Sequence, residues 1–132
     1  MFRVTREIDF CYGHRLLQYD GKCRHLHGHN GTAIITLEAP ELDRLGMVVD
    51  FSHMKRVLQA WIDEHLDHQM ILHRDDPVIP HLRKLGETFF TLDVNPTAEN
   101  IAKLIYEQAQ KHGFPVVEVS LWETTSSYAT YR

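Results

Sequence analysis

The first stretch of the chain alternates apolar and polar side chains in the way that a half-buried β-strand does. Apolar residues stand at every second position from Phe2 to Tyr12, with Arg6 as the one exception, and polar residues separate most of them. Successive side chains of a strand point to opposite faces of the sheet, so this alternation predicts a strand with one buried face. His14 closes the strand on that same face. A second strand is predicted over residues 32–38.

Two later stretches carry apolar residues with the spacing of one helix face. The first begins after Asp50, a residue type that caps helices well, and is expected to run as far as residues 66–68. The second is expected to begin with Asn95 as the capping residue before Pro96 and to end near Gly113. The residues expected on the buried faces are Phe51, Met54, Leu58, Trp61, Ile62 and Leu66 in the first helix and Ala98, Ile101, Ala102, Ile105 and Ala109 in the second.

Two further strands are predicted towards the end of the chain, over residues 116–123 and 127–131. The connection over residues 69–94 is longer than a compact domain normally leaves without structure, and residues 86–94 are expected to add a short strand. The main elements follow in the order strand, strand, helix, helix, strand, strand. This order predicts an α+β fold, in which a four-stranded antiparallel sheet carries two helices on one face.

The composition is that of one globular domain. With 132 residues, of which 43% are hydrophobic, the chain can bury a core without disulfides, so we expect residues 1–132 to form a single domain and Cys11 and Cys23 to stay unpaired. A net charge of -4 and the lack of a basic stripe argue against nucleic acid as a partner. No apolar run approaches the roughly 20 residues that span a bilayer, and the first residues do not resemble a signal peptide. We therefore expect no membrane partner and a cytoplasmic location.

The histidines are the exception to this ordinary composition. There are ten, and four of them lie between positions 14 and 29. If His27 and His29 lie on an extended segment, their imidazoles leave on the same side, with the parity of the apolar residues that follow them. His14, at the end of a neighbouring strand, could bring a third imidazole to the same place. Three histidines with an open fourth position are typical of a catalytic zinc site.

This pattern leaves two other interpretations open. One is a solvated histidine-rich loop that holds no metal. In the other, Cys23 is the fourth ligand of a closed, structural zinc site, which coordination chemistry permits. The spacing of the residues does not decide between these interpretations.

Three acidic residues are also candidates for chemistry. Asp67 stands beside His68 where the first helix ends, and a carboxylate can orient an imidazole for acid–base work, although a solvated helix end is the simpler explanation. Glu123 shares the parity of Val117 and the other apolar residues of its strand, so it needs a partner. That partner is either a core salt bridge or a bound ring edge that offers paired N–H donors. Glu99 lies in the first turn of the second helix, where a negative charge suits the helix dipole.

Six ordered motifs, spread over residues 2–131, resemble those of one enzyme family. They are Phe10-x-x-x-His14, Cys23-x-x-x-His27-Gly28-His29, Asp50-Phe51, Leu66-Asp67-His68, Pro96-Thr97-Ala98-Glu99-Asn100 and Glu123-Thr124. In this order the chain is similar to the 6-pyruvoyltetrahydropterin synthase and 6-carboxytetrahydropterin synthase family. One segment departs from the family pattern: Cys11-Tyr12-Gly13 replaces the pair of small residues that is common before the first histidine.

The resemblance implies a tunnelling fold and an assembly. The sheets of several subunits would join into a trimeric barrel, and two barrels usually stack into a hexamer with active sites between subunits. It also implies a role for each motif. The zinc ligands would be His14, His27 and His29; the catalytic thiol would be Cys23; the proton relay would be Asp67 and His68; the pterin anchor would be Glu123; and the same pocket would be lined by Glu99 and Thr97.

Within this family, the chain is expected to be a 6-carboxytetrahydropterin synthase. Such a lyase converts the small-molecule substrate 7,8-dihydroneopterin triphosphate to 6-carboxy-5,6,7,8-tetrahydropterin and releases acetaldehyde and triphosphate, on the route to queuosine. The basic residues nearest the site in sequence are Arg15, Lys22 and Arg24, which are candidates for binding the triphosphate.

Other functions share the same motifs. A 6-pyruvoyltetrahydropterin synthase eliminates triphosphate and retains the side chain, and a folate-pathway variant cleaves dihydroneopterin. The folate-pathway variant tends to carry a glutamate in the region of the thiol, so Cys23 argues against it. A non-enzymatic module stabilised by zinc, with Cys23 as the fourth ligand, is the alternative from another class of protein.

Overall fold

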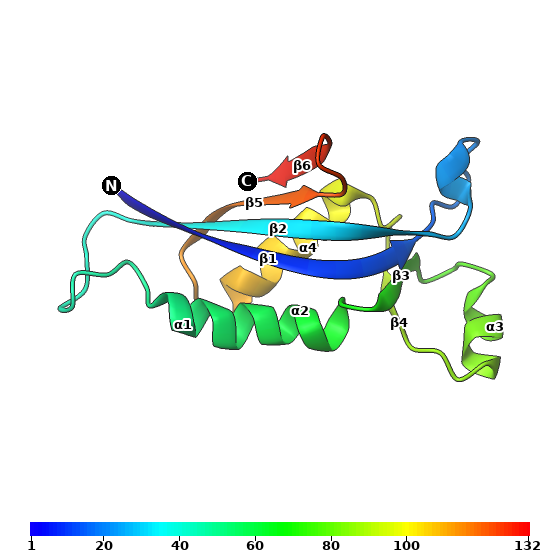
Figure 1. Ribbon diagram of the computed structural model, residues 1–132, viewed down its shortest axis with the longest axis horizontal. Coiled ribbons are helices and arrows are strands. Elements are labelled where there is room, and N and C mark those ends of the chain that lie inside the picture. The colour runs from blue at the N-terminus through cyan, green and yellow to red at the C-terminus, as the bar shows by residue number, and fades with distance from the viewer.

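A long antiparallel hairpin forms the centre of the sheet in the computed structural model, which describes residues 1–132 (Figure 1). Strand β1 (Phe2–His14) pairs with β2 (His27–Ala39) in an unbroken register from Phe2 opposite Ala39 to His14 opposite His27. The first strand ends where the alternation predicted. The second begins at His27 rather than at residue 32, so the histidine-rich segment belongs to the sheet.

The sheet has six strands and is mixed, which corrects the predicted four-stranded antiparallel sheet. Its order is β4-β3-β1-β2-β5-β6. The strands on the β2 side pair antiparallel, whereas β3 is parallel to β1 and β4 is parallel to β3. The four additional strands are β3 (Gln69–His73), β4 (Phe89–Leu92), β5 (Val116–Trp122) and β6 (Tyr128–Tyr131).

The long connection between the two main helices supplies the unexpected part of the sheet. The short strand predicted within residues 86–94 is confirmed as β4, but β3 was missed because its five residues show no alternation of apolar and polar side chains. Helix α3 (Ile79–Lys84) was also missed. Figure 1 shows α3 apart from the other helices, beyond the β3 and β4 end of the sheet.

The first predicted helix forms, with a wider turn inside it. Asp50 is its N-cap, and the Asp50 carboxylate accepts from the Ser52 N–H at 2.8 Å. The helix consists of α1 (Phe51–Met54), a π-helical turn (Lys55–Gln59) and α2 (Ala60–His65). Its buried residues, which recur every four positions, are Met54, Leu58, Ile62 and Leu66. Of the other two residues expected on this face, Trp61 is only partly buried and Phe51, in the first turn, is exposed. A four-residue spacing drifts around a regular α-helix of 3.6 residues per turn, and the wider π turn offsets that drift.

The second predicted helix, α4 (Ala98–Lys111), buries the face that its spacing indicated. Its N-cap is Thr97, whose hydroxyl accepts from the Asn100 N–H at 3.2 Å, so the prediction of Asn95 as the cap was wrong. Asn95 is used elsewhere, as described below. Gly113 follows the helix with φ +84°, the left-handed conformation that favours glycine at a helix end.

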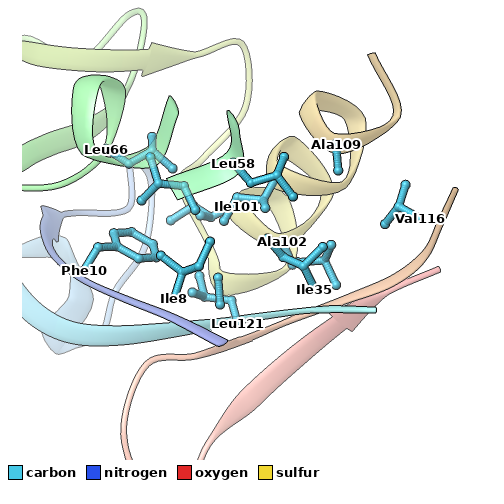
Figure 2. Packing of buried hydrophobic residues seen from close by; sticks show 14 of the residues in the cluster. Ile8, Phe10, Ile35, Leu58, Leu66, Ile101, Ala102, Ala109, Val116 and Leu121 are labelled. Atoms are coloured by element: carbon cyan, nitrogen blue, oxygen red, sulfur yellow. The ribbon is translucent and has the colours of Figure 1, made fainter. Parts of the chain in front are cut away.

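The helices α1, α2 and α4 cover one face of the sheet, as predicted (Figure 1). Between them and the strands lies one hydrophobic core of 19 buried residues. Figure 2 shows Ile8, Phe10, Ile35 and Leu121 of the sheet facing side chains of the helices. The pairing of β5 with β2 shifts by one residue between Thr36 and Leu37 of β2. Beyond this shift the buried face of β5 carries Val116 in place of the predicted Val117. None of the helices combines the length and the apolar character needed to cross a membrane.

Candidate functional site

Three histidines meet at one end of the β1–β2 hairpin. His14 and His27 are directly opposite each other in the register, and His29 follows His27 on the same face of β2. One nitrogen from each ring lies within 4.8 Å of one from each of the others. The geometry predicted from the spacing is confirmed: the three rings come together on paired strands of the sheet and not in a separate solvated loop.

Backbone carbonyls orient two of the three rings. Nδ1 of His14 lies 2.7 Å from the carbonyl oxygen of Pro96, and Nδ1 of His27 lies 2.7 Å from that of His25. A carbonyl only accepts, so each Nδ1 carries a proton, and Nε2 is the nitrogen of each ring that is left to bind a metal. Metal-binding histidines commonly donate the N–H of their other ring nitrogen to a backbone carbonyl in this way.

The segment that carries Pro96 is itself held in place by two asparagines. The Asn95 side chain accepts from the Leu17 N–H at 2.9 Å and donates to the Leu17 carbonyl at 3.1 Å. The Asn100 side chain donates to the Asn95 carbonyl at 2.9 Å. Asn95 therefore joins the loop after β1 to the start of α4, and this places the Pro96 carbonyl behind His14.

The three residues fit a metal ion chemically. His14 is 2% exposed, and this burial lowers its pKa, so its ring stays neutral and keeps a lone pair for coordination. Nε2 of His14 and Nε2 of His29 are 3.1 Å apart. Two ligands about 2.0–2.1 Å from one tetrahedral zinc ion would be about 3.3 Å apart, which is close to this spacing. The donor set can therefore hold a divalent ion.

Glu123 lies beside the histidines, directly after β5. One of its carboxylate oxygens is 3.8 Å from Nε2 of His14, and the other is 3.8 Å from Nε2 of His29. The hydroxyl of Tyr12 donates to Oε1 of Glu123 at 3.3 Å. No lysine or arginine pairs with Glu123, so the interpretation as a core salt bridge has no support. Burial, and then the negative charge of Glu123, raise the pKa of Tyr12 far above its ordinary value. Sequence reasoning placed Glu123 on this face but did not assign Tyr12 to the site.

Cys23 lies in the loop that joins the two histidine-bearing strands. It belongs to the short 3-10 turn Lys22–Arg24 and is half-buried, and its carbonyl accepts from the Leu16 N–H at 2.8 Å. Its sulfur is not a member of the group of atoms that could share one ion with the histidines. The alternative in which Cys23 is the fourth ligand of a closed site therefore has no support in the geometry. Cys11 and Cys23 are both free.

Asp67 and His68 form a hydrogen-bonded pair. Nδ1 of His68 lies 2.9 Å from Oδ2 of Asp67, and the other oxygen of Asp67 accepts from the Cys11 N–H at 2.9 Å. Adjacent residues of a helix do not face each other, but His68 lies beyond the helix with φ +59°, which lets the two side chains meet. Burial alone would raise the pKa of Asp67, but the hydrogen bonds from Cys11 and His68 outweigh it and hold the pKa below its ordinary value. The His68 side chain is 78% exposed.

A cleft adjoins part of the site, and the remaining predicted site residues lie at the start of α4. This cleft of about 640 Å³ is lined by His27, His29 and His68 among others, so it adjoins both the cluster of three histidines and the Asp67–His68 pair. Thr97 uses its hydroxyl to cap α4. Glu99 is exposed in the first turn of α4 and makes no side-chain hydrogen bond within the chain.

Arg15, a candidate for binding triphosphate, is already paired. Its Nε donates to Oδ2 of Asp76 at 2.8 Å, and its Nη2 donates to the other oxygen. The Asp76 side chain is fully buried, and Oδ1 also accepts from the Val78 N–H at 2.8 Å. Burial opposes the ionisation of Asp76, but the bonds from Arg15 and Val78 prevail and lower its pKa. Arg15 therefore ties the end of β1 to the segment that leads into α3.

Comparisons with known proteins agree with this architecture. The family model described as 6-pyruvoyl tetrahydropterin synthase matches residues 3–132. The chain belongs to this family. It is 38% identical to a protein of Rickettsia bellii named 6-carboxy-5,6,7,8-tetrahydropterin synthase, over 97% of this chain and 98% of that protein.

Two solved structures have the same fold. An uncharacterized protein from Wolinella succinogenes superposes with a TM-score of 0.80 at 33% identity, and the match covers 98% of this chain and 97% of that one. The 6-pyruvoyl tetrahydropterin synthase of Caenorhabditis elegans superposes with a TM-score of 0.74 at 23% identity, covering 99% of this chain and 94% of that one.

Replacement of His27 by alanine should abolish stable metal binding, because it removes one of three protein ligands. Mutation of a residue that only hydrogen-bonds to a metal ligand typically lowers metal affinity roughly 10- to 100-fold. Loss of a ligand itself should lower the affinity for zinc by more than this. Metal content is measured by atomic emission after equilibration with zinc and dialysis. His112→Ala is the matched control, since His112 is exposed and its Nδ1 bonds only the Gln108 carbonyl, at 2.8 Å. Full occupancy in His27→Ala would contradict the assignment.

Replacement of Asp76 by asparagine should destabilise the fold by about 1.5–3 kcal/mol at pH 7, because a buried charge-assisted pair is lost. The pKa of Asp76 is lowered in the folded state, so its contribution is present above the unfolded pKa of about 3.9 and is lost as the pH falls through the folded pKa. The difference between variant and wild type in urea unfolding should therefore narrow below about pH 3.9. Asp75→Asn, at a side chain that is 74% exposed, is the control. If the difference in the free energy of unfolding between variant and wild type stayed constant below about pH 3.9, the ion pair would be excluded as its source.

Proposed function

We propose that this protein is a 6-carboxytetrahydropterin synthase, a zinc-dependent lyase acting on 7,8-dihydroneopterin triphosphate. The observation that carries the proposal is the cluster of three histidines with a carboxylate directly beside it. Such a cluster offers an open coordination position, and the carboxylate offers an acceptor for a guanidine-like ring edge. The name of the Rickettsia bellii relative supports the carboxy branch over the pyruvoyl branch.

His14, His27 and His29 are the residues that would hold the zinc ion. When bound, zinc would polarise the hydroxyl and carbonyl oxygens of the substrate side chain and make its protons more acidic. Other residues of the chain would keep His14 neutral and would orient the rings of His14 and His27. Burial of His14 and the carbonyls of Pro96 and His25 serve this purpose.

Glu123 would anchor the pterin ring. Its carboxylate can accept two N–H donors from the 2-amino-4-oxo edge, which fixes the plane of the ring as well as its position. Because Glu123 is next to the histidines, a ring held there carries its side chain towards the metal cluster. Thr97 and Glu99, at the start of α4 beyond Pro96, would line the same pocket.

Cys23, Asp67 and His68 would move protons. Cys23 is half-buried in the loop that joins the two histidine-bearing strands, and its thiol would act on the side chain of a substrate bound at the histidines. The hydrogen bond from Nδ1 of His68 to Asp67 leaves Nε2 of His68 free to accept or donate a proton. The exposure of this ring in the single chain suits a site that a neighbouring subunit closes, in a trimer or hexamer.

The two branches of the family differ in atom balance. Formation of 6-carboxytetrahydropterin with acetaldehyde and triphosphate consumes one water molecule, whereas formation of 6-pyruvoyltetrahydropterin with triphosphate consumes none. The pyruvoyl product is therefore the second candidate, and only the carboxy branch yields a two-carbon aldehyde.

Incubation of the zinc-loaded protein with 7,8-dihydroneopterin triphosphate should yield 6-carboxytetrahydropterin by mass spectrometry, with an equal amount of acetaldehyde. Cys23→Ala should retain its zinc and lower turnover by about 100-fold or more, because positioned proton transfer contributes at least that much. Cys11→Ser is the matched thiol control and should stay active.

The other outcomes are distinct. A 6-pyruvoyl product without acetaldehyde would move the assignment to the second candidate. Unchanged substrate would exclude both branches. Loss of zinc together with Cys23 would instead support a structural site.

Replacement of Glu123 by glutamine should weaken pterin binding by one to two orders of magnitude. The variant keeps the shape of the side chain but loses its charge and one acceptor, and a hydrogen bond to a charged group contributes roughly 1.5–3 kcal/mol. Calorimetric titration with 7,8-dihydroneopterin and the melting temperature are both measured. Wild-type affinity with a lowered melting temperature would show that Glu123 only stabilises the fold.

A further inference from the structure

We infer that Tyr12 is a positioning residue for the pterin anchor, one that holds the carboxylate of Glu123 in a single orientation beside the metal cluster. The inference rests on the proposed function, because it assigns Tyr12 a role through Glu123. The side chain of Glu123 makes one hydrogen bond within the chain, which it accepts from the Tyr12 hydroxyl at 3.3 Å.

The Tyr12 ring is enclosed on several sides. It is 3% exposed, and it stacks on Phe10 with centroids 5.3 Å apart. It also packs edge-on against the His14 ring at 5.3 Å and at a tilt against the His29 ring at 5.6 Å. A ring packed in this way has little freedom to rotate, so its hydroxyl occupies a defined point. The phenol therefore supplies a donor at a fixed place on the border between the core and the histidines.

The opposite strand is built to admit this ring. Gly31 lies on β2 close to Tyr12, and a Cβ atom added at Gly31 would be 2.8 Å from Cε1 of Tyr12. Real Cβ atoms do not approach a ring so closely, so any side chain at this position would displace the tyrosine. The glycine provides the space that the ring occupies.

Glu123 needs such a donor because its own backbone does little to fix its side chain. It follows the last residue of β5, and its carboxylate oxygens are 3.8 Å from the nearest imidazole nitrogens, beyond hydrogen-bond distance. Each carboxylate oxygen has two acceptor sites, so Oε1 can accept from Tyr12 and still accept from a ligand. With one contact fixed, the free acceptor sites face a bound ring edge in a constant plane.

The test is the affinity for 7,8-dihydroneopterin of the zinc-loaded Tyr12→Phe protein, measured by calorimetric titration. This variant keeps the ring, and hence the fit over Gly31, but removes the hydroxyl. We expect the affinity to fall roughly three- to tenfold, as for loss of one hydrogen bond, with zinc content unchanged and with KM affected more than kcat. Tyr106→Phe is the control, because Tyr106 is a half-buried phenol that packs on Tyr131 at 4.9 Å, away from the site.

The same substitution made in a Glu123→Ala variant distinguishes a residue that positions Glu123 from one that contacts the ligand directly. In Glu123→Ala, the additional change Tyr12→Phe should cause no further loss of affinity, because the group it positions is gone. An equal further loss would overturn the inference and make Tyr12 a direct ligand contact. Wild-type affinity in Tyr12→Phe, with weak binding in Glu123→Ala, would overturn the inference and leave the proposed function intact. Wild-type affinity in Glu123→Ala would overturn the inference together with the pterin-anchor role of Glu123, whereas the synthase activity itself is decided separately by the product analysis.

Discussion

The direct pairing of His14 with His27 across the β1–β2 hairpin is the constraint on which the candidate site depends. The period of a strand is two residues, so a slip of one residue would send the histidines of one strand to the opposite face. The register is held along the whole hairpin by the buried residues on that face, including Ile8, Phe10 and Ile35 (Figure 2). The same packing that stabilises the core therefore also sets the distances between the imidazoles.

Three of the candidate site residues at this end of the sheet are supported by a polar contact from a distant part of the chain. Pro96, just before α4, orients His14; Tyr12 of β1 contacts Glu123 at the end of β5; and the Cys11 N–H contacts Asp67. These groups are in or next to the core, where a polar atom without a partner is costly. The contacts satisfy the buried atoms and restrict the side chains at the same time, so stability and preorganisation have a common origin here.

The single chain presents the proposed machinery only in part. The metal cluster is half-enclosed, but the His68 ring is largely exposed, and β4 and β6 are edge strands with one unpaired side each. The proposed assembly would account for both features, since joined edges complete the backbone pairing and a neighbouring subunit covers the Asp67–His68 pair. Arg15, by contrast, already has its partner in Asp76, which leaves Lys22 and Arg24 as the basic candidates of the neighbouring loop for the proposed triphosphate.

The sequence by itself determined the parts of the molecule that depend on local periodicity. The alternation in β1, the helix-face spacing in α1, α2 and α4, and the parity of His27 and His29 are properties of neighbouring residues, and these predictions were confirmed. The ordered motifs likewise identified the family. Contacts between distant segments were decided only by the tertiary structure. Strand β3 forms because β1 offers its edge, Asn95 bonds Leu17 instead of capping a helix, and Tyr12 reaches Glu123 across 111 positions of sequence. Local patterns carry no information on such pairings, because their energy arises only when the folded chain brings the partners together.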